Sequence, residues 1–190
     1  MTEMKLWTVQ KYTAVNEILK QGIYQPDFSR SWYASQGEME DHFYKALLEM
    51  FYLLNGIQLP GLVFTFAKNV ENQYIDDFSS YEEFQQFIAS RKAAINSLWN
   101  QLAQPDACIL ELEYNNQTFN PMFIDINDFQ ALMPPVMELP PYSNAVITQI
   151  YQDFSQGIIR PSVFPTFLMQ AHMPNIKREN LKGIYPIFRI

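Results

Sequence analysis

Residues 109–114 alternate apolar and acidic side chains, and this alternation restricts the fold more than any other feature of the chain. Side chains two residues apart on a β-strand point to the same face, so Glu111 and Glu113 share one face. The opposite face takes the apolar residues Leu110, Leu112 and Tyr114. The pattern is typical of a half-buried antiparallel strand, and it predicts that both glutamates lie on the solvated face.

A polar turn follows this strand and predicts a β-hairpin. Asn115-Asn116-Gln117 separates an expected strand near residues 108–114 from a second one near 119–126. If the turn sets the matching register, Phe123 on the returning strand joins the apolar face of the first strand.

Four other segments have apolar residues at helical spacing. They predict helices near residues 12–21, 39–55, 81–104 and 143–156. Gly22, Gly56 and Gly157 are placed to end three of them, and Ser80 with Glu83 fits a capping box that begins the helix at 81.

Further strands are expected in "KLWTVQ", "PGLVFTFAK", "SVFPTFLMQAH" and "GIYPIFRI". Pro165 and Pro186 remove ladder donors from the last two, which predicts edge strands or bulges there. The predicted fold class is α+β, with a mainly antiparallel sheet of about five strands packed with three longer helices.

The length and composition suit one domain over residues 1–190. Hydrophobic residues make up 48% of the 190 residues and charged residues 17%, so the chain can bury enough apolar surface to fold. Thirteen Lys and Arg against twenty Asp and Glu give a net charge of -7, which repels a phosphate backbone. No nucleic-acid partner is therefore expected.

Cys108 is the only cysteine, which suits a reducing compartment. The apolar stretch "ALLEMFYLL" is too short for a membrane helix, and the N-terminus lacks the apolar core of a signal peptide. These features predict a cytoplasmic protein with no membrane partner. Its partner is expected to be a small molecule or another protein.

Asp125, Asn127 and Asp128 carry oxygen ligands that suit a hard cation, but they lack the glycine-centred spacing of a calcium loop. Asp128 fits better as the N-cap of a short helix that begins at Phe129. The two histidines, His42 and His172, belong to no metal-binding motif. No metal or other cofactor is expected.

Four short motifs occur in the order of a known family: Leu6-Trp7-Thr8-Gln10, Glu111-Leu112-Glu113, Asp128-Phe129 and Gln170-Ala171. Together they resemble a bacterial domain-of-unknown-function family, number 3841, over nearly the whole chain. This chain differs at 64–66, where such proteins often carry a tryptophan-rich strand, and at 172–173, where they often carry an aromatic pair. The resemblance implies a fold and no established activity.

Two functions of different classes follow. The first is a small-molecule-binding or interaction protein that uses an aromatic groove between sheet and helices. Its candidate binding residues are Trp7, Thr8, Gln10, Phe64, Phe66 and Gln170. The alternative is an enzyme, because a Glu-x-Glu on a strand resembles the catalytic pair of arginine-specific ADP-ribosyltransferases. Its candidate catalytic residues are Glu111 and Glu113.

Overall fold

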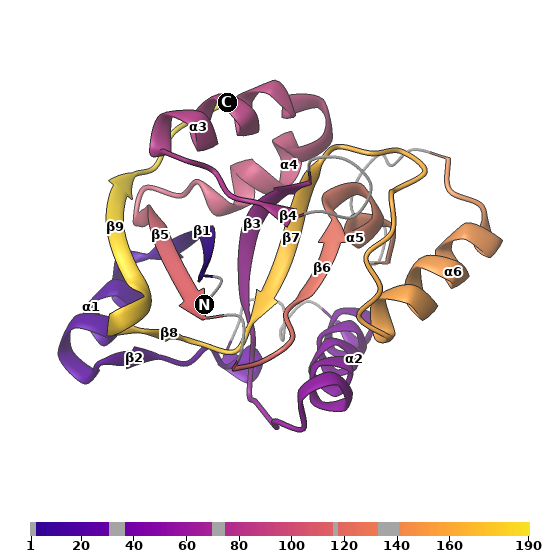
Figure 1. Ribbon diagram of the computed structural model, residues 1–190, viewed down its shortest axis with the longest axis horizontal. Helices are drawn as coiled ribbons and strands as arrows, with labels where there is room; N and C mark the ends of the chain where they lie inside the picture. The colour runs from indigo at the N-terminus through magenta and orange to yellow at the C-terminus, as the bar shows by residue number, and fades with distance from the viewer. Residues whose placement is uncertain (1–2, 31–36, 70–74, 116–117, 133–140) are drawn as a thin grey trace.

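The structure is a computed structural model that describes residues 3–30, 37–69, 75–115, 118–132 and 141–190 (Figure 1). The strands of the main sheet are β1 Glu3–Lys11, β3 Val63–Asn69, β4 Ile75–Asp76, β5 Ala107–Asn115, β6 Met122–Asp125, β7 Leu168–Met173 and β9 Leu181–Pro186. They pair antiparallel in the order β6-β7-β3-β1-β5-β9, and β4 also pairs with β3. A second, two-stranded sheet joins β2 Ile23–Tyr24 to β8 Ile176–Lys177.

The helices in the described residues are α1 Tyr12–Gln21, α2 Glu38–Asn55, α3 Tyr81–Ser90, α4 Lys92–Leu102, α5 Ile126–Leu132 and α6 Asn144–Ser155. Short 3-10 helices occur at Phe28–Arg30 and Arg178–Asn180. The fold is α+β with a mainly antiparallel sheet, as predicted. The predicted counts were wrong, because the described residues form a seven-stranded main sheet and six α-helices. None of these helices has both the length and the apolar character needed to cross a membrane.

The predicted hairpin is wrong. β5 pairs with β1 in a continuous register from Glu3↔Asn115 to Lys11↔Ala107, and with β9 on its other side. β6 pairs with β7 at the opposite edge of the sheet. A polar turn sets only the local geometry of the chain. The nine residue pairs that join β5 to β1 are long-range, and one face of β5 is buried along the strand.

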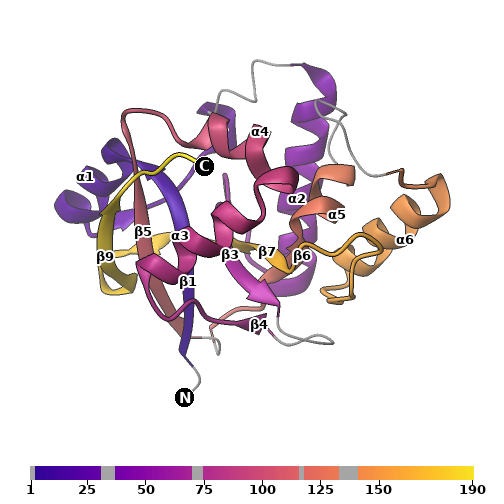
Figure 2. The same cartoon turned by 90° about the horizontal axis from the view of Figure 1, so that it is seen from above.

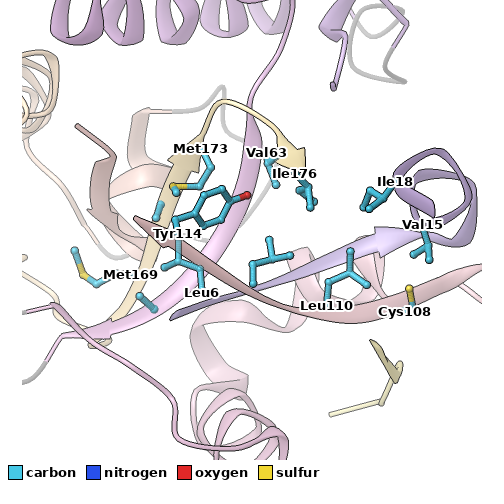
Figure 3. Packing of buried hydrophobic residues seen from close by; sticks show 13 residues of the cluster. Leu6, Val15, Ile18, Val63, Cys108, Leu110, Tyr114, Met169, Met173 and Ile176 are labelled. Atoms are coloured by element: carbon cyan, nitrogen blue, oxygen red, sulfur yellow. The ribbon is translucent and has the colours of Figure 1, made fainter. Parts of the chain in front are cut away.

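One face of the sheet packs against α1, and there the predicted alternation in β5 is confirmed. Leu110, Leu112 and Tyr114 are buried in a cluster that also contains Val15 and Ile18 of α1 (Figure 3). Phe123 packs against the same cluster from β6, although it does not pair with β5. Apolar side chains at every second position of several strands therefore build this layer.

The opposite face carries two clusters. Phe84 and Ile88 of α3, with Ile95 and Trp99 of α4, pack over Trp7 and Phe66 of the central strands. Leu47 and Phe51 of α2, Phe129 of α5 and Phe154 of α6 pack with Met122 and Ile124 of β6. Figure 2 shows α3 and α4 together, and α5 and α6 near the β6 end of the sheet.

The helix predicted for residues 81–104 is two helices, because the chain turns at Arg91. Arg91 has φ -103° and ψ 17°, and its Nε donates to the carbonyl oxygen of Thr166. The turn lets the apolar faces of both α3 and α4 reach the same cluster. The apolar pattern is continuous in sequence, whereas the helix is interrupted at a residue that contacts a distant segment.

The two strands that contain or follow proline differ from each other. β7 lies inside the sheet, and its first residue, Leu168, comes after Pro165. β9 is an edge strand that ends at Pro186, and its register with β5 shifts between Glu111 and Leu112. The edge position and irregular pairing predicted from proline are therefore found in β9 and not in β7.

The predicted cap of α3 is confirmed at Ser80, whose hydroxyl accepts from the backbone N–H of Glu83 at 3.2 Å. The Glu83 carboxylate reaches back to Ser79 rather than Ser80, and it also pairs with Lys68. We expect Ser80→Ala to lower the free energy of unfolding by about 1 kcal/mol, since one donor of the first turn loses its acceptor. Urea denaturation measures this effect. An unchanged midpoint would contradict the cap, and Ser97→Ala at an exposed position of α4 is the control.

Candidate functional site

A cavity of about 220 Å³ lies beside β6, between this strand and α6. Three consecutive residues of β6 line it, Phe123, Ile124 and Asp125, and the segment 158–163 after α6 closes part of it. α6 contributes Val146, Gln149, Ile150, Asp153 and Phe154, which lie three and four residues apart and so share one helical face. In both Figure 1 and Figure 2, α6 lies beyond the β6 end of the sheet.

Asp125 is a buried acid at the cavity wall that holds a distant loop in place. Its Oδ2 accepts from the backbone N–H groups of Thr166 at 2.9 Å and Phe167 at 3.1 Å, and the Thr166 hydroxyl also donates to it. Burial raises the pKa of Asp125 to about 6, although these hydrogen bonds oppose the shift. Phe167 adopts φ 61°, an unusual value for a bulky residue, and its N–H bond to Asp125 holds the loop in that conformation.

Asp128 is the second buried acid of the cavity. Its Oδ1 accepts from the Tyr142 hydroxyl at 2.6 Å and from the hydroxyl of Ser162. Burial raises the pKa of Asp128, and the two hydroxyl donors oppose this shift. The predicted N-cap role of Asp128 is wrong, because α5 begins at Ile126. Asp125 precedes the helix instead and accepts from the N–H of Asn127 at 2.9 Å.

Asp153 is the third acid, and it comes from α6. Its Oδ1 accepts from Gln149 Nε2 at 2.9 Å, and its Oδ2 lies 2.6 Å from Nε of Arg160. The Asp153 side chain is buried, whereas that of Arg160 is 57% exposed. Arg160 therefore approaches this carboxylate from the solvent side.

The cavity wall thus combines three carboxylates and one guanidinium with aliphatic and aromatic side chains. Buried carboxylates are stabilised by a nearby positive charge and by hydrogen-bond donors. The arrangement suits a group that carries a positive charge on an apolar body. Within the described ranges, no group of three or more His, Cys, Asp or Glu residues is placed to hold a metal ion.

The predicted catalytic residues lie elsewhere. Glu111 and Glu113 share one face of β5, as predicted, but each is held in an ion pair. Glu111 contacts Lys5 at 2.9 Å and accepts from the Tyr185 hydroxyl at 2.8 Å, while Glu113 lies 3.2 Å from Lys182. Their side chains are 14% and 27% exposed, so they are half-buried and not on the solvated face that was predicted. The same face carries the buried residues Ile109 and Trp7. Because β5 and β6 are far apart in the sheet order, these glutamates and the cavity acids form two separate groups.

The predicted binding residues lie inside the sheet layers. Trp7, Phe66 and Gln170 occupy one transverse row on β1, β3 and β7, through the register pairs Trp7↔Phe66 and Phe66↔Gln170. Phe64 shares their face, and Thr8 and Gln10 lie on the other one. Thr8 donates to the carbonyl oxygen of Phe64 at 2.7 Å and accepts from Gln10 at 3.0 Å. Three of the six predicted binding residues thus lie in one row across the sheet. None of the six lines the cavity.

His172 is a buried histidine that neighbours the cavity wall. Its ring packs against Phe64, Phe129 and Phe154, with centroids 4.8, 5.3 and 5.6 Å away. Burial lowers the pKa of His172 to about 3, so the imidazole is neutral at physiological pH. Its Nε2 has no hydrogen-bond partner among the described residues.

Asp153, Arg160 and the cavity itself were not predicted from the sequence. A signal was present in α6, because Gln149 and Asp153 interrupt the apolar stripe of Val146, Ile150 and Phe154. A polar residue on the buried face of a helix needs a partner, and that partner here is Arg160. No sequence pattern places α6 beside β6.

Comparisons with known proteins find no family model, no curated protein and no solved structure that matches the chain. The resemblance to domain-of-unknown-function family 3841 stays a prediction.

Proposed function

We propose that this chain is a non-catalytic binding protein whose cavity beside β6 takes a small organic cation with an apolar body. The observation that carries the proposal is that Asp125, Asp128 and Asp153 line one mainly apolar cavity. Arg160 is the positively charged residue of that lining. A bound ammonium group supplies the positive charge that buried carboxylates favour. The apolar walls bury the body of the ligand.

Asp128 is the acid best placed to receive the cation. Asp125 already accepts several backbone N–H groups, and Asp153 is paired with Arg160. Asp128 has only hydroxyl donors among the described residues, and both reach Oδ1. A hydroxyl is a weaker partner for a carboxylate than an ammonium group is.

The size of the cavity limits the ligand. Pockets for drug-sized ligands usually span about 300–1,000 Å³. This cavity, at about 220 Å³, suits a smaller molecule such as an aralkyl or branched alkyl amine.

Isothermal titration calorimetry with phenethylamine, and with its neutral N-acetyl derivative, tests the proposal. We expect the amine to bind and the acetylated compound to bind at least about tenfold more weakly, since it lacks the charge. Affinity for the amine should fall as the pH drops from 7.5 towards 5. In that range Asp125, whose pKa is about 6, gains a proton and loses its charge.

Asp128→Asn is the informative variant. The amide oxygen of asparagine can still accept from Tyr142 and Ser162, so the fold is kept while the charge is removed. We expect at least about tenfold weaker amine binding. Asp106→Asn, an exposed acid paired with Lys11, is the control and should bind as the wild type does. Equal binding of the amine and its acetyl derivative would contradict the proposal.

The alternative, an ADP-ribosyltransferase-like enzyme, stays a prediction. An assay of NAD binding and NAD consumption tests it. If the wild type binds or consumes NAD and Glu113→Gln abolishes this, the enzyme replaces the binding protein. We also propose a cytoplasmic location, since Cys108 is the only cysteine and is a buried thiol. Membership of family 3841 is proposed on the motifs quoted above.

A further inference from the structure

The segment from Arg160 to Phe167 covers one side of the cavity and contains no helix or strand. It lies between Ile159 and Leu168, which both pack in core clusters. In the described part of the chain, none of the residues of the segment belongs to these clusters or packs against them. Val163 is 59% exposed and Phe167 is 45% exposed. The segment therefore lies over the body of the protein with little apolar contact.

Polar contacts with the three carboxylates of the cavity hold this segment instead. They follow one another along it: Arg160 pairs with Asp153, Ser162 donates to Asp128, and Thr166 and Phe167 donate to Asp125. Water can replace each of these contacts when the segment moves away. The buried carboxylates are then hydrated, and this offsets part of the free energy of opening.

Two prolines stiffen the segment, and a strained residue ends it. Pro161 and Pro165 each have a fixed φ, so the chain between them has few conformations. Phe167 adopts φ 61°, a strained value for a bulky residue, and movement at this position relieves the strain. A stiff segment with a strained end is suited to move as one piece about its ends.

We propose that residues 160–167 form a lid that opens as one unit while the sheet stays folded, and so uncovers the cavity. Asp125, Asp128 and Asp153 are the latches that keep it closed. Opening exposes little additional apolar surface, because Val163 and Phe167 are already exposed. It therefore costs less free energy than global unfolding does. This motion does not require that the cavity takes a cation.

Native-state hydrogen exchange, followed by NMR on the protein without ligand, tests the lid. The backbone N–H groups of Thr166 and Phe167, which both donate to Asp125, report its opening. The N–H group of Leu110 reports global unfolding, because β5 is paired on both sides. We expect protection at Thr166 and Phe167 to be at least about a hundredfold lower than at Leu110, and to be unchanged by low urea concentrations. Equal protection at the three positions, with equal dependence on urea, would overturn the proposal.

Ser162→Ala tests whether the lid moves as one unit. The variant loses the bond to Asp128 in the closed state, and the bonds of Thr166 and Phe167 to Asp125 stay in place. If all latches open together, exchange at Thr166 and Phe167 should become about tenfold faster, since the closed state has lost one hydrogen bond. Unchanged exchange at these two positions would mean that the contacts open independently, and the lid would be ruled out.

Ser80→Ala is the matched control, because it removes the cap of α3, outside the lid. The cap is present in both the closed and the open-lid states, so its loss destabilises the two states equally. Exchange at Leu110 should become faster, whereas exchange at Thr166 and Phe167 should not change. A matching increase at all three positions would show that the lid opens only by global unfolding, which contradicts the proposal.

Discussion

Replacing Asp125 with alanine is expected to lower the free energy of unfolding by about 3 kcal/mol or more. The carboxylate accepts from the backbone N–H groups of Asn127, Thr166 and Phe167, and each of these loses its acceptor in the variant. A buried donor without an acceptor costs about 1–3 kcal/mol. The loss is large because one side chain joins β6 and α5 to the segment that leads into β7. Urea denaturation near pH 7 measures it.

The pH dependence of stability gives a second signature of Asp125. Burial raises its pKa from 3.8 to about 6, so the folded state binds this proton more tightly than the unfolded chain does. The stabilising contribution is therefore complete below about pH 3.8 and is lost as the pH rises towards 6. We expect Asp125→Asn to remove this contribution to the pH dependence, measured between about pH 3.5 and pH 7.

Asp106→Ala is the matched control for Asp125→Ala. Asp106 is exposed and paired with Lys11 at 3.0 Å, so its loss should lower the free energy of unfolding far less than the loss of Asp125 does. Equal effects at the two positions would show that the Asp125 hydrogen bonds contribute little to stability.

Trp99→Ala is expected to lower the free energy of unfolding by about 3–5 kcal/mol. Trp99 is fully buried between α4 and the sheet, where its ring lies 4.7 Å from that of Phe188 and 6.2 Å from that of Phe84. Its Nε1 donates to the carbonyl oxygen of Phe188 at 2.8 Å and so ties the C-terminal segment to α4. The variant loses the packing and the hydrogen bond together. Thermal or urea denaturation measures the sum.

A pair of phenylalanine variants separates the two contributions. Trp7 is as buried as Trp99, but its Nε1 has no hydrogen-bond partner among the described residues. Both Trp7→Phe and Trp99→Phe shrink the ring by the same amount, and only the second removes a hydrogen bond. Trp99→Phe should therefore cost about 1–2 kcal/mol more than Trp7→Phe. Equal costs would mean that the bond to Phe188 adds nothing to stability.

Much of the local structure could be predicted because its causes lie within a few residues. The ends of α1 and α2 follow from Gly22 and Gly56, which adopt φ 84° and 68° as a left-handed C-terminal residue does. The N-terminus of α6 follows from Ser143, which accepts from the N–H of Val146. The burial of Leu110 and Leu112 follows from the period of a strand.

Strand pairing could not be predicted in the same way. The turn after β5 is compatible with a hairpin, but β5 gains a longer partner in β1, about a hundred residues earlier in the chain. Such pairing depends on how many residues match and on which face they bury, and neither is recorded in a local pattern. The division of α3 from α4 was not predicted either, and it lies at Arg91, which contacts Thr166 of a distant segment.

The sequence alone determined that the chain alternates strands and amphipathic helices, that one face of β5 is apolar, and where several helices begin and end. These features depend on side-chain period and capping, which act over single turns. Only the tertiary structure decided that Asp125, Asp128 and Asp153 share one cavity and that Glu111 and Glu113 do not belong to it. The reason is that β6 and α6 meet through packing against Phe154 and neighbouring core residues, and packing acts between segments with no local signal for one another.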